Sequence, residues 1–247
     1  MKPETKRFEK QLIRKRNRLE RLAGKVCLRA LRAQIPTEIR SLESVHVQID
    51  FISDEPVKKF FKWLYGEAGK QFGMEYFKFL QRKSDEQFLE VEFLAEMERY
   101  ALEVAGSRIV AINATTKRLL QDATSKAIFE ANRGGYGVEK TKDLILQFME
   151  DAITPARAKA IAQTELITAS NRASFSGADK TGLTFRKYWS TSGLPNIRPS
   201  HIQAEQDSAD GISMNQPFSN GLMFPGDPKG TAAEVVNCRC TVLMEPL

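Results

Sequence analysis

The character of the chain changes around the stretch TPARAKAIAQTELITASNRASFSG, residues 154–177. Thr154 suits a helix N-cap and Pro155 suits the first helical turn, so we expect a helix that begins here and ends at Gly177. Upstream the sequence has helical periodicity, and downstream it has short apolar runs between loops rich in Gly, Pro, Asn and Asp. The stretch therefore predicts an α+β protein, mainly helical before this point and mixed after it.

The upstream region is expected to consist of long helices. Residues 5–33 contain no proline, and their apolar side chains recur at spacings of three, four and seven, which predicts one amphipathic helix. Further helical stretches are predicted over residues 55–82, 85–132 and 138–152. Gly66, Gly69 and Gly73 are expected to loosen the first of these, and the second is either one long helix or two.

The segment from Val45 to Phe51 is the exception in this region. Its apolar residues alternate with polar ones, and a period of two is typical of a strand. We therefore expect a short strand or an extended linker here.

Three strand-like runs follow Gly182, over residues 183–190, 212–218 and 235–244. They predict a short antiparallel sheet. The sequence thus divides into a basic amphipathic helical arm, a helical domain and a small α+β domain, with bounds of 1–40, 41–152 and 153–247.

The composition is that of a folded globular protein, with 42% hydrophobic and 28% charged residues. No run of about 18 apolar residues occurs, and residues 1–40 are too charged for the apolar core of a signal peptide. We therefore expect a protein that stays inside the cell, with no membrane partner. Its 3 cysteines suit a reducing compartment, and no structural disulfide is expected.

The positive charge is concentrated in the arm. Residues 1–40 hold 13 Lys and Arg against 4 Glu, and the rest of the chain is slightly acidic. Such a helix can neutralise DNA phosphates without reading sequence. The residues assigned to nucleic-acid binding are Lys10, Arg14, Lys15, Arg16, Arg18 and Arg21. The alternatives are that the helix docks on a protein partner, lies on a membrane surface or packs against the acidic region of its own chain.

His201, Cys238 and Cys240 are the residues best suited to holding a metal ion. Two thiolates and an imidazole make a partial zinc shell, and residues two apart on a strand point to the same face, so both sulfurs can converge. A fourth ligand is still needed, and the options are Asp207, Asp210, Asp227 or water. The alternative is that both thiols are ordinary buried side chains, with no cofactor.

Glu165 and Arg172 lie on the apolar face of the helix that starts at Pro155. Because a buried charge needs a partner, Glu165 is expected to pair with Arg172, or with His201 or Arg198 from the following loop. Such a pair would fix the helix against the sheet. General acid/base chemistry by Glu165 and His201 is the alternative.

A series of short motifs occupies the last part of the chain. In order they are Arg157, Thr164-Glu165, Lys187-Tyr-Trp189, Arg198-Pro-Ser-His201, Pro217-Phe218, Pro225-Gly-Asp-Pro228 and Asn237-Cys-Arg-Cys240. This succession resembles the C-terminal domain of the phage Mu F-like head morphogenesis family, over about residues 151–247. The resemblance rests on the order and spacing of the motifs.

The resemblance implies a few-copy virion protein that associates with the portal protein, alongside other head or scaffold proteins, during head assembly. It also implies contact with double-stranded DNA, without sequence preference, in packaging or delivery. The expected location is inside the head near the portal, and the host cytoplasm during assembly. On this view Arg157, Glu165, His201, Cys238 and Cys240 hold the domain together. Thr164, Trp189 and Asn237 are further residues of the structural motifs.

The alternative function is a zinc-dependent hydrolase or transferase centred on Glu165, His201 and Cys238. The chain contains 2 histidines and no recognisable Ser–His–Asp constellation, so it offers few catalytic bases. We therefore expect a non-enzymatic head protein.

Overall fold

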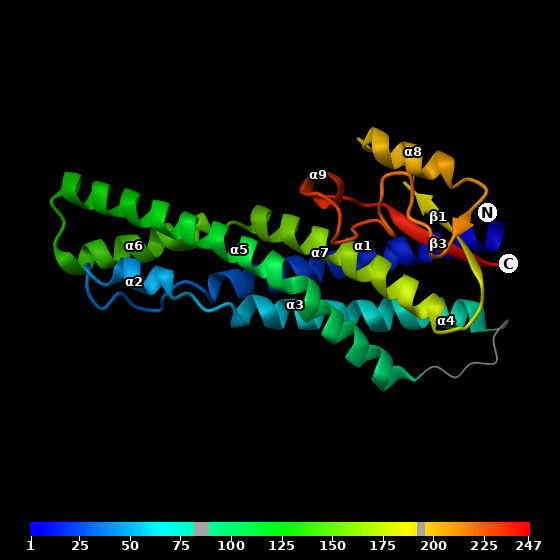
Figure 1. The fold of residues 1–247 in the computed structure, drawn as a ribbon. Helices are drawn as coiled ribbons and strands as arrows, with labels where there is room; N and C mark the ends of the chain where they lie inside the picture. Colours follow the sequence, from blue (N-terminus) through cyan, green and yellow to red (C-terminus); the bar gives the residue numbers. More distant parts are fainter. Residues whose placement is uncertain (82–88, 192–195) are drawn as a thin grey trace. The chain divides into compact units, whose positions relative to one another are not determined.

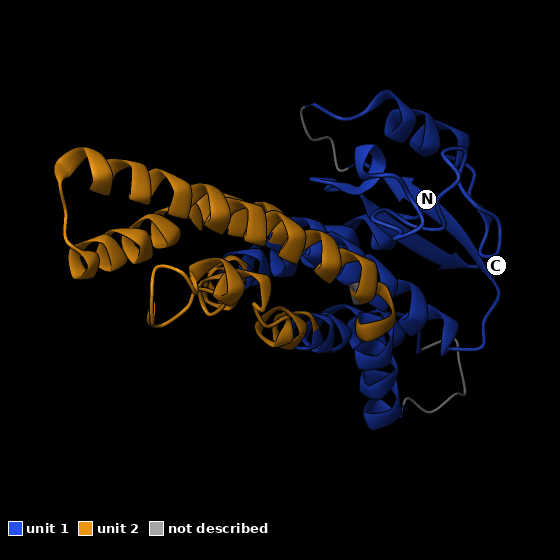
Figure 2. Ribbon diagram, turned by 60° about the vertical axis from the view of Figure 1, so that its left-hand side comes forward, with its two compact units in different colours: residues 1–23, 62–101, 162–247 blue, residues 24–61, 102–161 orange. Residues whose placement is uncertain are grey.

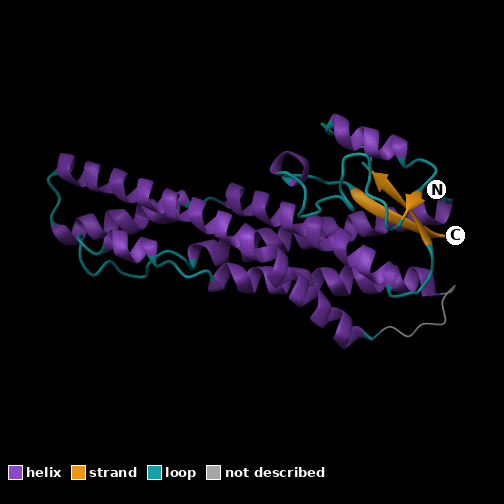
Figure 3. Ribbon diagram, viewed as in Figure 1, coloured by secondary structure: helices purple, strands orange, loops and turns teal. Residues whose placement is uncertain are grey.

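The computed structural model describes residues 1–81, 89–191 and 196–247. The chain is mainly helical with one small sheet, which confirms the expected α+β class (Figures 1 and 3). In chain order the elements are α1 (Pro3–Arg32), α2 (Val45–Asp50), α3 (Glu55–Ala68), η1 (Gly69–Gly73), α4 (Met74–Leu80), α5 (Glu90–Gly134), α6 (Val138–Ala152), α7 (Pro155–Asp179), β1 (Phe185–Ser190), α8 (Pro199–Asp207), β2 (Ile212–Ser213), α9 (Ala232–Val235) and β3 (Thr241–Pro246). Among these residues no helix is long and apolar enough to span a membrane.

The described chain forms two compact units, which Figure 2 distinguishes by colour. Unit 1 combines Met1–Ala23, Lys62–Ala101 and Ala162–Leu247, and unit 2 combines Gly24–Phe61 and Leu102–Ile161. Each unit therefore assembles segments that are far apart in the sequence. The three divisions expected from the sequence, in contrast, were each one continuous stretch of the chain.

The long helices lie where their periodicity predicted them. The buried side chains of α1 in unit 1 include Phe8, Leu12 and Leu19, which confirms its amphipathic character. The second predicted stretch is one continuous helix, α5, and residues 85–88 of that prediction lie outside the described part of the chain.

α7 begins as its sequence predicts. The Thr154 hydroxyl accepts a hydrogen bond from the Arg157 amide at 3.2 Å, which satisfies one of the free N–H groups of the first turn. The helix continues past Gly177 to Asp179 and is followed by a turn with Gly182 at φ +65°. Gly177 therefore has another role than ending the helix.

The predicted strand at Val45–Phe51 is wrong, because α2 occupies most of this segment. Val45 and Ile49, four residues apart, are buried, whereas Val47 and Phe51 are 57% and 82% exposed. The buried pair follows the helical period, and the residues that completed the period of two face solvent.

The expected loop around His201 is also helical. α8 buries only His201 and Ala204, so its sequence carries too short an apolar pattern to indicate a helix. The run predicted over residues 212–218 keeps just two strand residues, β2, and the run over 235–244 becomes the end of α9, a turn and β3.

Gly177 lies where α7 meets the π-helical segment η1 in unit 1. A Cβ atom on Gly177 would overlap the backbone of Gly73, and a Cβ on Gly73 would overlap the ring of Phe93. The two helices therefore meet backbone to backbone, which glycine alone permits. Gly69 and Gly73, two of the three glycines that were expected to loosen residues 55–82, are the first and last residues of η1.

The sheet of unit 1 has the strand order β2–β1–β3, and both pairings are antiparallel, as expected. β1 and β3 pair over their whole length, from Phe185 opposite Pro246 to Ser190 opposite Thr241. The amide of Met244 in β3 also donates to the Tyr76 hydroxyl of α4 at 2.8 Å. This bond ties the sheet to the helices of the same unit.

A polar row on α7, formed by Thr164, Thr168 and Asn171, supports the irregular segment between β2 and β3. These residues are spaced by four and three, so they lie on one face of the helix. The Thr164 hydroxyl accepts from the Asn237 amide at 3.1 Å, and the Thr168 hydroxyl donates to the Gly226 carbonyl at 2.8 Å.

Asn171, the third member of the polar row, uses both ends of its amide. Its Nδ2 donates to the carbonyls of Pro225 and Cys240 at 2.9 and 3.1 Å, and its Oδ1 accepts from the Val242 amide at 3.0 Å. The row thus satisfies buried backbone groups that have no ladder partner in the sheet.

Replacing Gly177 with alanine is expected to lower the free energy of unfolding by about 1–3 kcal/mol, because the new methyl group has to displace the backbone at Gly73. Gly66→Ala in the same unit is the control, since a Cβ there meets nothing within 4 Å. It is expected to be neutral or to stabilise by up to about 1 kcal/mol. Denaturant unfolding measures both, and equal effects would contradict the close helix crossing.

Candidate metal centre and basic surface

His201 lies on α8, in contact with β1. Pro199 opens this helix after Arg198, whose backbone is extended, and His201 follows within the first turn. The rings of His201 and Trp189 meet edge to face, with their centroids 4.9 Å apart. Because His201 is only 1% exposed, both ring nitrogens need partners inside the protein.

Cys238 and Cys240 lie in the turn between α9 and β3 (Figure 1). The turn is made by Asn237, which adopts φ +57°, a left-handed conformation that asparagine tolerates better than most residues. The Cys240 amide donates to the Cys238 sulfur at 3.4 Å. The sulfurs converge as expected, although a turn and not a strand brings them together.

Both thiols meet the same nitrogen of His201. Nδ1 lies 3.4 Å from the Cys240 Sγ and 3.8 Å from the Cys238 Sγ. The three ligand atoms all lie within 4.8 Å of one another, and all three residues are buried. The predicted set therefore forms one cluster, which we call the His–Cys–Cys cluster.

The other nitrogen of His201 faces Glu234 of α9. Nε2 lies 3.0 Å from the Glu234 Oε2, and the Ser200 hydroxyl donates to the same carboxylate at 3.0 Å. Glu165 was expected to pair with Arg172, His201 or Arg198. It is buried on α7, but Glu234 is the carboxylate that fixes the imidazole.

Each of the two thiols shifts the pKa of the other. The pKa of Cys238 is lowered to about 5, chiefly because the Cys240 thiol hydrogen-bonds to its thiolate. Burial raises this pKa, and the neighbouring His201 lowers it. The same interaction with Cys238, together with burial, raises the pKa of Cys240. Trp189 opposes this rise through its indole N–H.

Arg16 of α1 lies behind the cluster. It is 5% exposed, and its guanidinium donates to the Cys240 carbonyl at 3.2 Å and to the Thr241 hydroxyl at 2.5 Å. Burial lowers its pKa to about 10, while both thiols act to raise it. Arg16 was expected to bind DNA, and this burial makes it part of the fold of unit 1 instead.

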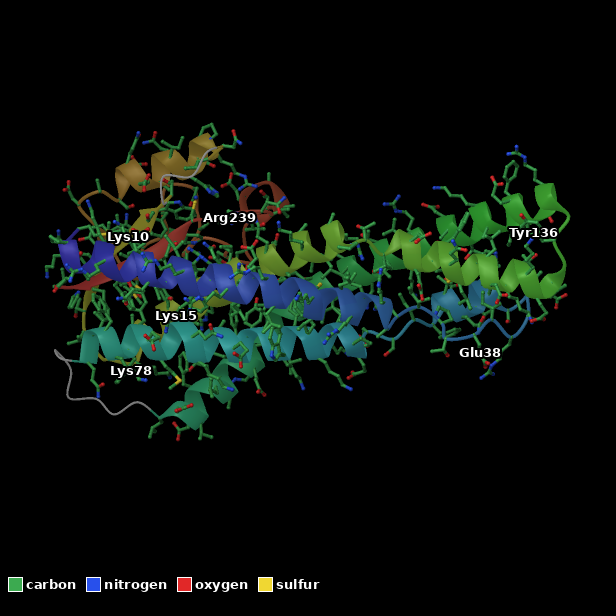
Figure 4. All side chains as sticks on the ribbon, turned by 180° about the vertical axis from the view of Figure 1, so that it is seen from behind. Lys10, Lys15, Glu38, Lys78, Tyr136 and Arg239 are labelled. Atoms are coloured by element: carbon green, nitrogen blue, oxygen red, sulfur yellow. The ribbon has the colours of Figure 1, made fainter. Side chains whose placement is uncertain are left out.

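A cavity of about 280 Å³ opens onto the cluster. Its walls include His201, both cysteines and two arginines, Arg198 and Arg239. Arg239, labelled in Figure 4, also pairs with Glu20 of α1 at 3.0 Å. The cluster is thus reachable by a small molecule, although its own side chains are buried.

The remaining predicted site residues lie outside the cluster. In the described chain none of the three aspartates considered as a fourth ligand joins it. Asp227 instead accepts from the amides of Met223 and Lys229. Arg157 lies in unit 2 and donates to the Ile112 carbonyl and the Thr116 hydroxyl, both at 3.0 Å.

No protein-family model matches the chain, and no match was found among curated proteins or solved structures.

The second expected feature, the basic helix, takes a definite form in unit 1. Exposed cations recur every three or four residues along one face of α1, at Arg7, Lys10, Arg14, Arg18 and Arg21. Over these residues the helix rises about 21 Å.

These five residues, which we call the basic row, differ from Lys15 and Arg16 of the same helix. No ion pair within the described chain neutralises a member of the row. Lys15, by contrast, faces α4 and pairs with Glu75 at 3.2 Å (Figure 4). Of the residues assigned to nucleic-acid binding, Lys10, Arg14, Arg18 and Arg21 therefore remain exposed and available.

Sequence reasoning missed two residues of the cluster's surroundings. Glu234 stands in a loop sequence without periodicity, and nothing in that sequence relates it to a histidine 33 residues away. Arg16 is one cation among many on α1, but it follows Phe8 and Leu12 by eight and four residues, on the apolar face. That spacing was the one available signal that Arg16 is buried.

Proposed function

We propose that this chain is a minor head protein of a phage, which associates with the portal and contacts double-stranded DNA through the basic row of α1. The resemblance to the Mu F-like family supplies the biological setting. The observation that carries the proposal is the basic row itself, a set of exposed cations along one helix that no acidic group of the described residues neutralises.

The arrangement of the motif residues supports the resemblance. Trp189, His201 and Phe218 come from three different motifs, and their rings pack together, with Trp189 5.1 Å from Phe218. Asn237 hydrogen-bonds to Thr164, and Lys187 donates to the Met223 carbonyl at 3.0 Å. Burial lowers the pKa of Lys187 to about 8. The motif residues of unit 1 are thus parts of one domain core and not scattered coincidences.

The charge distribution on α1 supports contact with DNA. Two glutamates of this helix are engaged within unit 1, since Glu9 accepts from the Ser190 hydroxyl at 2.5 Å and Glu20 pairs with Arg239. Neither glutamate therefore neutralises a cation of the basic row. A line of cations about 21 Å long can contact several phosphates without reading bases.

Glutamine at all five row positions is expected to weaken binding to short DNA duplexes of unrelated sequence by about the same factor for each. The slope of log affinity against log salt should become shallower by up to about 4–5, close to 0.9 per lost phosphate contact. Fluorescence anisotropy over a range of salt concentrations measures both.

The matched control removes the same charge elsewhere, with glutamine at the exposed residues Arg118, Lys126, Arg133, Lys140 and Lys159. It should change the salt slope by less than about 1. Equal losses in the two variants would show a general effect of net charge and contradict a DNA-contacting row.

The portal association is tested by co-expressing the tagged chain with the portal protein of the same phage. We expect the two proteins to purify together in salt that dissociates DNA, and the five-residue row variant to purify with the portal as well. The major capsid protein, tagged in the same way, gives the background level of co-purification. A wild-type chain that purifies with the portal no better than this background would contradict the proposed setting.

A further inference from the structure

The His–Cys–Cys cluster has the dimensions of a metal shell. In a zinc tetrahedron with bonds of about 2.3 Å to sulfur and about 2.0 Å to nitrogen, a sulfur and a nitrogen lie roughly 3.5 Å apart. The measured distances from His201 Nδ1 to the two sulfurs are 3.4 and 3.8 Å. One cation placed between the three atoms would therefore reach all of them without a change of fold.

His201 Nδ1 can form a full hydrogen bond with only one sulfur at a time, and the remaining bond in the cluster is the one from the Cys240 thiol to Cys238. An imidazole Nδ1 has either one proton to donate or one lone pair to accept with, yet two sulfurs converge on it. Nε2 is already engaged by Glu234. A metal ion satisfies both thiolates and the nitrogen at once, which a single proton does not.

The groups around the cluster are those that support a metal ligand. A ligating histidine commonly donates its second N–H to a carboxylate, which fixes the ring, and Glu234 has this position at 3.0 Å. The Cys240 amide points at the Cys238 sulfur. The indole Nε1 of Trp189 is buried beside Cys240, and Cys240 is the acceptor nearest to hand for its N–H group. A thiolate there would be a stronger acceptor for this donor than a thiol.

We propose that His201 Nδ1, Cys238 Sγ and Cys240 Sγ bind one zinc ion, whose fourth position faces the cavity lined by Arg198 and Arg239. Two thiolates balance the charge of the ion, and thiolate with imidazole is the ligand set that zinc prefers over magnesium or calcium.

The fourth ligand comes from solvent. Asp207 accepts from Gln203, and Asp227 is held by two backbone amides, so neither points to the cluster. The cavity adjoins all three ligands, and Arg198 and Arg239 contribute to its wall, so water or a small anion has room to complete the shell. The site would join α8 to the start of β3. It does not depend on the proposed role in the phage head.

The test uses the full chain, purified under reducing conditions without chelator, and measures zinc by plasma mass spectrometry. About one zinc per chain is expected, and its removal by a chelator should lower the unfolding midpoint by at least ~5 °C, reversed by zinc. Cys238→Ser and Cys240→Ser should lose the metal. Cys27→Ser, which removes the buried thiol of unit 2, should keep it.

Cobalt substitution covers the case in which the serine variants fail to fold. The wild-type protein loaded with cobalt should show the intense visible bands of a tetrahedral site with thiolate ligands, and azide should shift them if the fourth position is open. Unchanged bands would overturn the open position. A folded wild-type chain that neither contains zinc nor gains stability from it would overturn the site, as would an intact mass showing a Cys238–Cys240 disulfide.

Discussion

The fold of unit 1 depends on the polar row of α7. The segment between β2 and β3 has almost no regular structure, and buried backbone groups without partners cost about 1–3 kcal/mol each. Thr164, Thr168 and Asn171 satisfy these groups at points spread from Pro225 to Val242. Because the same hydrogen bonds fix Asn237 and the Cys240 carbonyl, the row also sets the position of both cysteines.

The row acts together with the close contact between α7 and η1. Glycine at positions 73 and 177 lets the helix approach the rest of the unit, and small side chains such as Ala169 and Ala173 are fully buried beside it. The polar side chains are then held at a depth where few waters compete with them. Packing and hydrogen bonding therefore support one another, and the stretch of residues 154–177 supplies both.

Local signals explain what the sequence predicts well. The N-cap at Thr154, the long apolar periodicities and the glycines at 69 and 73 act within a few residues, so the helices and the class of fold follow from them. The prediction is wrong for the short elements because they contain too few residues to give a clear local signal. Val45–Asp50 is too short for its period to be decisive, and α8 buries only two side chains.

The residues of the candidate site also fall into those that the sequence indicates and those that it does not. Residue type alone indicates His201, Cys238 and Cys240, because thiols and imidazoles are the side chains that bind zinc. Glu234 and Arg16 belong to the site through contacts across 33 and 224 residues, and no local pattern carries that information. Exposure likewise separates the basic row from Arg16, although all of them are cations on one helix.

Unit 1 combines the His–Cys–Cys cluster, for which we propose a zinc ion, with the basic row of α1. X-ray absorption at the zinc edge of the purified protein tests the proposed zinc site most directly. We predict two sulfur atoms at about 2.3 Å, one imidazole nitrogen at about 2.0 Å and one further light atom from solvent. A shell of nitrogen and oxygen atoms without sulfur would place any bound zinc elsewhere and contradict the account.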